Sequence, residues 1–282
     1  VQRWMSDERV DDFKSSRRPE GQASATAVAL GAAGCGKQSS PANPAPVPPA
    51  PPADGVALLN RMHDAYIGKW FKTVTFVQQT IQTHENGVTD TTIWYEALRS
   101  PNRLRIDFAD PKAGNGVIYT ADSVYVVRAG KVTRTVPSGN PFLPFVQGVY
   151  DQPIDTTLRQ IQPYKFDMSK FRTATWEGRP TYVVGSQSAT DTTSPQFWVE
   201  QERLVVVRMI LGLNPTSPEV TDIRLEDYRA VGGGWLAVRV DIMQGGKVVQ
   251  REVYSNWRGD VEIPADFFVA EKWSDVRHWA TP

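Results

Sequence analysis

The sequence is poor in the residue types on which most metal and redox chemistry depends. Its 282 residues contain one cysteine and three histidines. A single cysteine excludes an intramolecular disulfide and every metal site built from several cysteines. The histidines, His63, His84 and His278, are far apart and lack the spacing of a metal site or a catalytic triad. We therefore expect no metal and no other cofactor.

The chain also lacks an excess of charge and a long apolar run. It has 31 Lys and Arg residues against 31 Asp and Glu residues. Nucleic-acid binding depends on clustered basic residues that neutralise phosphates, so we expect no nucleic-acid partner. A transmembrane helix needs about 18 or more consecutive apolar residues, and the sequence contains no such run. Attachment to a membrane must therefore depend on a feature other than basic charge or a transmembrane helix.

No motif of an enzyme stands out. Gly232-Gly233-Gly234 is not followed by the Lys and Ser or Thr of a phosphate-binding loop, and its place between two strand-like segments predicts a flexible turn. The charged residues between Asp222 and Arg229 could serve acid-base chemistry, but alternating charges on a solvated strand face explain them more simply. We expect the protein not to be an enzyme.

Residues 1–34 have the order of a signal segment. Lys14, Arg17 and Arg18 precede a run of small residues that ends in Ala32-Ala33-Gly34-Cys35. The last four residues are similar to a lipobox, in which the signal is cut before a cysteine that carries a diacylglycerol. Cys35 is thus the predicted lipidation site. The alternative is a polar tail with an incidental cysteine.

Residues 35–54 read as a linker that follows the lipid anchor. Seven of the twelve residues from Pro41 to Pro52 are proline, a composition that favours an extended polyproline conformation. Gly36 stands where an aspartate would favour the inner membrane under the sorting rule of enteric bacteria. We therefore expect a lipid-anchored protein on the periplasmic face of the cell envelope, at the outer membrane.

Residues 55–282 show the periodicities of one β-rich domain. Asp54 can cap a helix that runs to about Trp70, because apolar residues recur at helical spacing there. From Thr73 the period falls to two, and Asn86-Gly87 separates two alternating runs, which predicts a β-hairpin.

Alternation recurs along most of the remaining chain, and a short amphipathic helix is predicted at 155–161. We expect roughly ten or eleven strands and few helices. A large antiparallel sheet curls because its strands twist. The predicted fold is mainly β: one curved antiparallel sheet, an unclosed half-barrel, with helices covering its concave face. The alternating segments lie at residues 73–84, 89–98, 103–108, 116–120, 123–128, 131–136, 171–176, 181–186, 196–200, 204–211, 221–231, 235–244 and 247–257.

The order of these elements, and several short motifs within them, resemble the periplasmic lipoprotein localization group (LolA/LolB-like, outer-membrane lipoprotein-sorting proteins). Phe76-Val77-Gln78-Gln79 follows the first helix, and the segment from Ser100 to Phe108 is similar to the family's "R-P-g-r-l-R-w" strand. Phe197-Trp198-Val199-Glu200 is similar to "l-W-v-d", and the segment from Ile263 to Phe268 to the terminal "i-P-d-x-x-F". The resemblance covers about residues 55–273.

The resemblance implies an unclosed barrel whose concave apolar side receives the acyl chains of a lipid or a lipidated protein, without an enzymatic step. The protein would act as a monomer in transfer or reception at the envelope membrane. A plain packed core is the alternative for each candidate residue, since alternation alone does not separate a cavity from a filled interior. The candidates for the acyl-binding wall are Phe76, Leu104, Ile106, Phe108, Ile118 and Tyr125.

Three arginines are candidates for contact with a lipid head group or with the helices that cover the wall. In the family an arginine directly before the proline helps to hold the lid closed, whereas this chain has Ser100 there and Arg99 one residue earlier. A strand would point Arg99 to the opposite face, which puts lid locking in doubt. Arg103 and Arg105 could meet a head group or be ordinary solvent-facing charges, and exposed charges are the more common case.

A second function stays open on the sequence. The domain could be an envelope interaction module, such as a stress sensor resembling the anti-sigma regulator RseB, that binds a protein through an edge strand or the lid. Bound lipid would distinguish the carrier from this module.

Overall fold

The computed structural model describes residues 50–137, 139–212 and 219–280. The chain divides into two units, Val1–Pro51 and Pro52–Pro282, and every helix and strand described below belongs to the second. The predicted signal segment, Cys35 and residues 35–49 of the predicted linker lie outside the described residues. Within the described ranges, no helix combines the length and the apolar character that crossing a membrane requires.

The first helix, α2 (Gly55–Tyr66), begins where the capping pattern predicted. The Asp54 side chain accepts a hydrogen bond from the Ala57 amide at 2.8 Å. The helix buries Leu58, Leu59 and Met62 along one face. It ends four residues before the predicted Trp70, because Gly68 adopts a positive φ of 74° that an α-helix does not contain.

The strands form a single antiparallel sheet of thirteen, in the order β6-β5-β4-β3-β2-β1-β13-β12-β11-β10-β9-β8-β7. β6 and β7 remain at opposite edges, so the sheet does not close. The mainly β, unclosed half-barrel is confirmed, although each alternating segment forms its own strand and the count exceeds the expected ten or eleven. The strands are β1 (Thr73–Thr83), β2 (Thr89–Arg99), β3 (Arg103–Phe108), β4 (Gly116–Tyr119), β5 (Ser123–Arg128), β6 (Lys131–Pro137), β7 (Phe171–Trp176), β8 (Arg179–Val184), β9 (Gln196–Glu200), β10 (Val206–Leu211), β11 (Thr221–Val231), β12 (Gly234–Gln244) and β13 (Lys247–Gly259).

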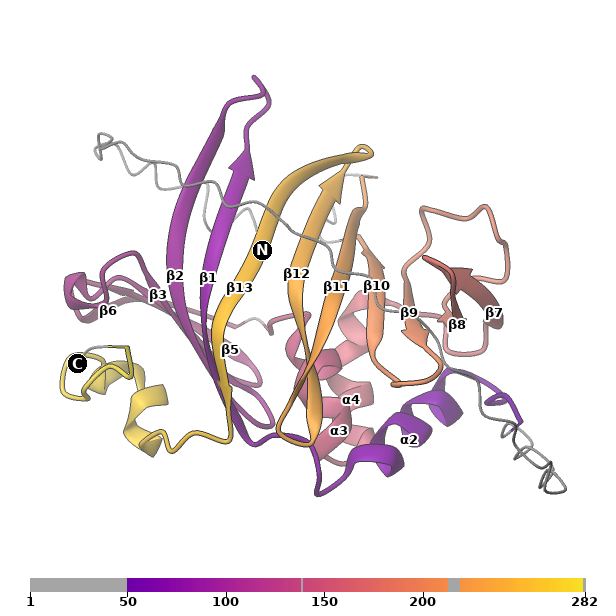
Figure 1. Cartoon of the computed structure of the whole chain (residues 1–282), viewed down its shortest axis with the longest axis horizontal. Helices are drawn as coiled ribbons and strands as arrows, with labels where there is room; N and C mark the ends of the chain where they lie inside the picture. The colour runs from indigo at the N-terminus through magenta and orange to yellow at the C-terminus, as the bar shows by residue number, and fades with distance from the viewer. Residues whose placement is uncertain (1–49, 138, 213–218, 281–282) are drawn as a thin grey trace, which may run out of the picture. The chain divides into compact units, whose positions relative to one another are not determined.

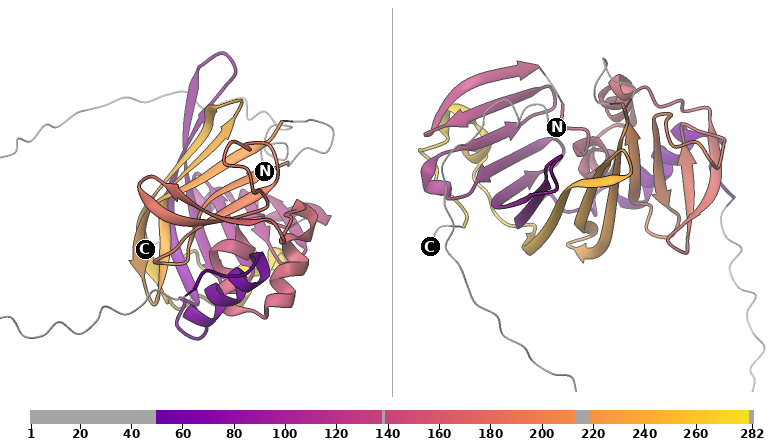
Figure 2. Two further views of the ribbon diagram at one scale, coloured as in Figure 1. Left: turned by 90° about the vertical axis from the view of Figure 1, so that its right-hand side faces the viewer. Right: turned by 90° about the horizontal axis from the view of Figure 1, so that it is seen from above.

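Two short helices join α2 on one side of the curled sheet. A helical turn at Pro144–Gly148 runs directly into α3 (Val149–Asp151), and α4 (Ile154–Ile161) follows it. We call α2 and the segment 144–161 the helical cover, and the sheet face against which it packs the inner face (Figures 1 and 2). The predicted helix at 155–161 thus forms.

The opposite, outer face carries a second cover made by the end of the chain. Between β13 and residue 280 the chain makes two 3-10 turns, Ala265–Phe268 and Ala270–Lys272. Phe267 and Phe268 pack on Ala97, while Trp273 packs on Ile118. Around Ala97, Arg105 and Ile118 the outer face is therefore buried as well as the inner face, although antiparallel sheets commonly leave one face to solvent.

The glycine turn between β11 and β12 is closely packed, contrary to the predicted flexible loop. A side chain at Gly233 would meet the Lys69 carbonyl oxygen 1.9 Å away, and one at Gly234 would meet the Trp70 ring at 2.6 Å. Glycine is required here because the segment that follows α2 lies directly against the turn.

Candidate functional site: the inner face of the sheet

The inner face is apolar beneath the helical cover. The ring centroid of Phe145, from the cover, lies 4.9 Å from that of Phe197 on β9, and both side chains are almost completely buried. The first residue of α2, Gly55, approaches Val184 so closely that a β-carbon there would lie 2.6 Å from it. Met209 and Ile223 continue the same face by strand pairing. The helices thus cover a continuous apolar surface.

Four of the six predicted wall residues share this inner face. Phe76 pairs with Glu96, and Glu96 pairs with Ile106, so their side chains point to the same side. Leu104 and Phe108 alternate with Ile106 on β3. All but the half-buried Phe108 are buried.

Ile118 and Tyr125 do not belong to that wall. Ile118 pairs with Arg105 and with Tyr125, which places all three on the outer face. Ile118 is fully buried there with Trp273, and Tyr125 packs against the same cluster. The expectation of one wall fails for these two residues because an apolar outer face beneath the C-terminal segment has the same alternation as an apolar inner face.

The three candidate arginines also lie on the outer face, away from the cover. Arg99 donates a hydrogen bond to the Ile263 carbonyl and lies 5.2 Å from the Phe268 ring centroid, so it faces away from the cover as expected. Arg103 is exposed. Arg105, which was expected to face solvent, is only 2% exposed and forms a two-bonded ion pair with Asp107, at 2.8 Å for each bond. The prediction of a solvent-facing Arg105 is wrong because the distant C-terminal segment covers it.

The helical cover is nevertheless held at the position of the missing arginine. The Ser100 hydroxyl donates to Asp151 at the end of α3, and Lys72 forms an ion pair with the same carboxylate. The Asn102 amide donates to Gln152 at 2.7 Å, within a buried contact. The sequence-based doubt about lid locking is thus answered by a different set of contacts around the Ser-Pro-Asn turn.

We expect Ser100→Ala to weaken this attachment measurably. The change removes one hydrogen bond to a charged acceptor, a loss of about 1.5–3 kcal/mol from the free energy of unfolding. Urea unfolding of the two proteins measures it. Ser169→Ala is the matched control, because the Ser169 hydroxyl also donates to an aspartate, Asp167, but lies in an exposed turn. Equal losses in the two variants would contradict a special role for Ser100.

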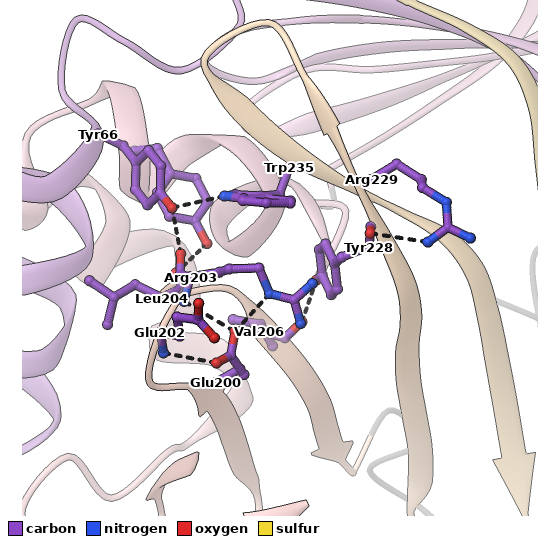
Figure 3. Close-up of polar contacts among 10 residues, drawn as sticks. Tyr66, Glu200, Glu202, Arg203, Leu204, Val206, Tyr228, Arg229 and Trp235 are labelled. Atoms are coloured by element: carbon purple, nitrogen blue, oxygen red, sulfur yellow. Dashed lines mark hydrogen bonds and ion pairs between the residues drawn. The ribbon is translucent and has the colours of Figure 1, made fainter. Parts of the chain in front are cut away.

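A second set of contacts ties α2 and α3 to the turn between β9 and β10 (Figure 3). The Tyr66 hydroxyl donates to the Arg203 carbonyl at 2.7 Å and accepts from the Trp235 indole at 3.0 Å. The Tyr150 hydroxyl donates to the Leu204 carbonyl at 2.9 Å. Burial raises the pKa of both tyrosines, so both hydroxyls remain protonated donors at neutral pH.

The turn that receives these bonds is itself fixed by charge. Arg203 Nε donates to Glu200 at 2.8 Å, and Glu200 also accepts from the Glu202 and Arg203 amides (Figure 3). These bonds outweigh burial and lower the Glu200 pKa. The acceptors at this turn are therefore held in place, and Tyr66 and Tyr150 attach the cover to them through neutral hydrogen bonds.

A cavity of about 150 Å³ lies beside this turn, lined mostly by polar and charged side chains, including Arg179, Thr181 and Glu226. Ligand pockets for drug-sized molecules measure roughly 300–1,000 Å³ and are mainly apolar. This cavity is too small and too polar for an acyl chain. Among the described residues, no group of three His, Cys, Asp or Glu side chains is placed to hold a metal ion.

The inner face changes character between β2 and β13, where two buried glutamates stand among tyrosines and amides. Glu96 is 5% exposed and Glu252 is 8% exposed. Burial raises the pKa of both carboxyls, and the Glu252 charge raises that of Glu96 further. Burial, followed by the charges of both glutamates, also raises the pKa of Tyr119. We call Glu96, Tyr119, Gln250, Glu252 and Tyr254 the inner carboxyl cluster.

This cluster makes stability depend on pH in a definite direction. A carboxyl whose pKa is raised by folding stabilises the fold fully below the usual pKa of 4.5, and the contribution is lost as pH rises through the folded-state pKa. We expect the free energy of unfolding to fall as pH rises above the usual carboxyl pKa of 4.5, and to fall much less in Glu96→Gln/Glu252→Gln. Urea unfolding at each pH measures this, and identical slopes in the two proteins would contradict the assignment.

This cluster is not among the predicted site residues, although the sequence contains a signal for it. Glu96 occupies the same phase of the alternation as Trp94 and Leu98, so a charged residue stands at an apolar position. On β13, Gln250, Glu252 and Tyr254 likewise share one phase. A carboxylate in an inward phase is a local conflict that often marks a functional position.

Comparison with known proteins gives similar solved structures. The chain matches a DUF1329 family protein from Desulfovibrio piger at 13% identity and a TM-score of 0.49, covering 76% of this chain and 95% of that one. It matches a LolA superfamily protein from Nitrosomonas europaea and an outer membrane lipoprotein-sorting protein domain, described as putative in its name, from Vibrio parahaemolyticus. Both show 10% identity, with TM-scores of 0.47 and 0.46, covering 76% of this chain and 97% of each. No protein-family model matches the chain. No curated protein matches it either.

Proposed function

We propose that the protein binds acyl chains of a lipid or a lipidated protein on its inner face, and that it does so without covalent chemistry. The observation that carries the proposal is the apolar inner surface lying under helices that side-chain hydrogen bonds and packing hold in place. Release of Ser100, Tyr66 and Tyr150 from their acceptors would free the cover without breaking any strand pair. The ligand would then bind between the displaced helical cover and the apolar inner face of the sheet, which stays fixed.

The energetics of such a site suit a lipid. Each methylene group removed from water contributes about 0.8 kcal/mol, so one long chain offsets the loss of the contacts made by the cover. On the inner face, Phe76, Leu104 and Ile106 extend the apolar wall beyond the helices toward β3. We include these residues and Phe108 in the proposed site, and exclude Ile118, Tyr125 and the three arginines.

We further propose that a lipid on Cys35 tethers the domain to the bacterial envelope, at the outer membrane, with residues 35–54 as the spacer. The protein would then receive or transfer lipoproteins or lipids at that membrane as a monomer. One of the solved structures named above is described in its name as an outer membrane lipoprotein-sorting protein domain, in agreement with this proposal.

The test uses the full chain carrying Cys35→Ala, so that no lipid attached to the cysteine enters the measurement. The purified protein is extracted with organic solvent and searched for acyl-containing molecules by mass spectrometry, and a fluorescent fatty acid is titrated alongside. We expect about one acyl-containing molecule per chain or saturable binding of the probe. A protein free of lipid that also ignores the probe would overturn the proposal and favour the envelope interaction module.

A further inference from the structure

The inner carboxyl cluster gathers polar groups from three strands on the proposed ligand-binding face. Glu96 on β2 pairs with Phe76, whose ring stacks on Tyr254 of β13 at a centroid distance of 4.5 Å. Glu252 shares the phase of Tyr254 on β13, and Tyr119 on β4 pairs with Leu104. The cluster therefore adjoins the apolar wall formed by Phe76, Leu104 and Ile106.

The two glutamates of the cluster differ in their hydrogen bonds. Glu252 accepts from the Gln250 amide at 2.6 Å and from the Tyr254 hydroxyl at 2.8 Å. Glu96 is 5% exposed, and among the described residues no hydrogen-bond donor contributes to the pKa of its carboxyl, whereas two donors lower that of Glu252. Polar groups at largely buried positions are normally hydrogen-bonded, so this carboxyl differs from its neighbour Glu252. Glu96 is thus the glutamate of the cluster whose carboxyl no described donor stabilises.

The cluster also lacks a cation among the described residues. Glu96, Tyr119, Glu252 and Tyr254 are coupled to one another by charge, and no lysine or arginine contributes to the electrostatics of any of them. The adjacent arginine on β13, Arg251, points to the outer face, where it pairs with Asp241 at 2.6 and 2.7 Å. The inner face therefore offers two carboxyls and two phenolic oxygens with no positive charge to match them.

We propose that the inner carboxyl cluster is a subsite for the ammonium group of an amine-bearing amphiphile, whose hydrocarbon chain lies along Phe76, Leu104 and Ile106. An ammonium group has three hydrogen-bond donors and no acceptor. These donors match the oxygens of Glu96, of Glu252 and of Tyr119. An ammonium group would favour ionisation of a carboxyl whose pKa burial raises, whereas a hydroxyl or a carboxylate head supplies no positive charge to do so. This inference rests on the proposed function and specifies its ligand class.

The test compares three amphiphiles that differ in their head group and share a twelve-carbon hydrocarbon chain. Dodecylamine, dodecanol and dodecanoic acid displace a fluorescent fatty probe from the full Cys35→Ala chain, at neutral pH and below the concentrations at which they form micelles. We expect dodecylamine to bind at least about tenfold more tightly than dodecanol, with dodecanoic acid the weakest. The same titrations are repeated with Glu96→Gln and with the matched control Glu85→Gln, which removes one charge in the exposed hairpin turn.

Glu96→Gln is expected to reduce the preference for the amine to less than about threefold while leaving dodecanol binding unchanged, and Glu85→Gln is expected to keep the preference. Equal affinities for amine and alcohol in the starting protein, or an intact preference in Glu96→Gln, would overturn the inference and leave the proposed function standing. Failure of all three amphiphiles and of the probe to bind would overturn the proposed function, and the inference with it.

Discussion

Replacing Asp107 by alanine is expected to lower the free energy of unfolding by about 3–5 kcal/mol, one of the two largest effects that the structure predicts. Asp107 is completely buried and balances the charge of Arg105, to which it is joined by two bonds of 2.8 Å. Its removal leaves a guanidinium buried under the C-terminal segment without a counter-charge. The Phe267 and Trp273 rings, 4.2 and 3.7 Å from Arg105, cannot replace a carboxylate.

The effect is read from urea unfolding, with Asp266→Ala as the control. Asp266 pairs with Lys272 at 2.7 Å, but both side chains are about half exposed, and such pairs contribute less than about 1 kcal/mol. The double change Arg105→Met/Asp107→Leu is expected to recover most of the loss, because it removes both charges together. A loss below about 1 kcal/mol in Asp107→Ala would show that the C-terminal cover is not held by this pair.

Phe145→Ala is the second large prediction, and it links stability to function. Phe145 is 1% exposed and contacts Phe197 and Phe166, so its truncation is expected to cost about 3–5 kcal/mol. Because the lost contacts attach the helical cover to the inner face, the cover should open more often. We expect the fluorescent fatty probe to associate faster, which stopped-flow fluorescence measures.

Phe142→Ala is the matched control for this change. Phe142 lies three residues earlier in the same segment but is only half-buried. It should lose less stability and leave the association rate near that of the starting protein. Slower or unchanged association in Phe145→Ala, despite the loss of stability, would indicate that the probe does not bind beneath the cover.

The fold was predictable because alternation is a local property. Every alternating segment forms a strand, and the hairpin at Asn86-Gly87 joins β1 to β2 as expected. The assignment of faces was not predictable to the same degree. Ile118 and Ile106 both alternate as core residues, but one lies under the C-terminal segment and the other on the inner face.

The environment of charged residues depended on contacts that no local pattern reveals. Arg105 is buried by Phe267, which lies 162 residues further along the chain. Alternation predicts a solvated strand face at Asp222, yet Asp222 forms a two-bonded ion pair with Arg208 at 2.8 and 2.9 Å. Such pairs between neighbouring strands are decided by sheet register, which alternation alone does not fix.

The attachment of the cover shows how a family pattern can be satisfied by other residues. Ser100 replaces the expected arginine, and the segment is held by Asp151 and Gln152 instead. A neutral hydrogen bond such as Asn102–Gln152 contributes about 0.5–1.5 kcal/mol, and one to a charged acceptor such as Ser100–Asp151 about 1.5–3 kcal/mol. A cover attached in this way can be displaced by a ligand that buries comparable apolar area.

The most direct test of acyl binding on the inner face is photo-crosslinking with a fatty acid that carries a diazirine in its chain. The full Cys35→Ala chain is irradiated with the probe, digested and mapped by mass spectrometry. The account predicts crosslinks in β1, β3 and β9 and in the helical cover, near Phe76, Ile106, Phe197 and Phe145, that unlabelled fatty acid competes away. Crosslinks confined to the outer face, or none that compete, would contradict it.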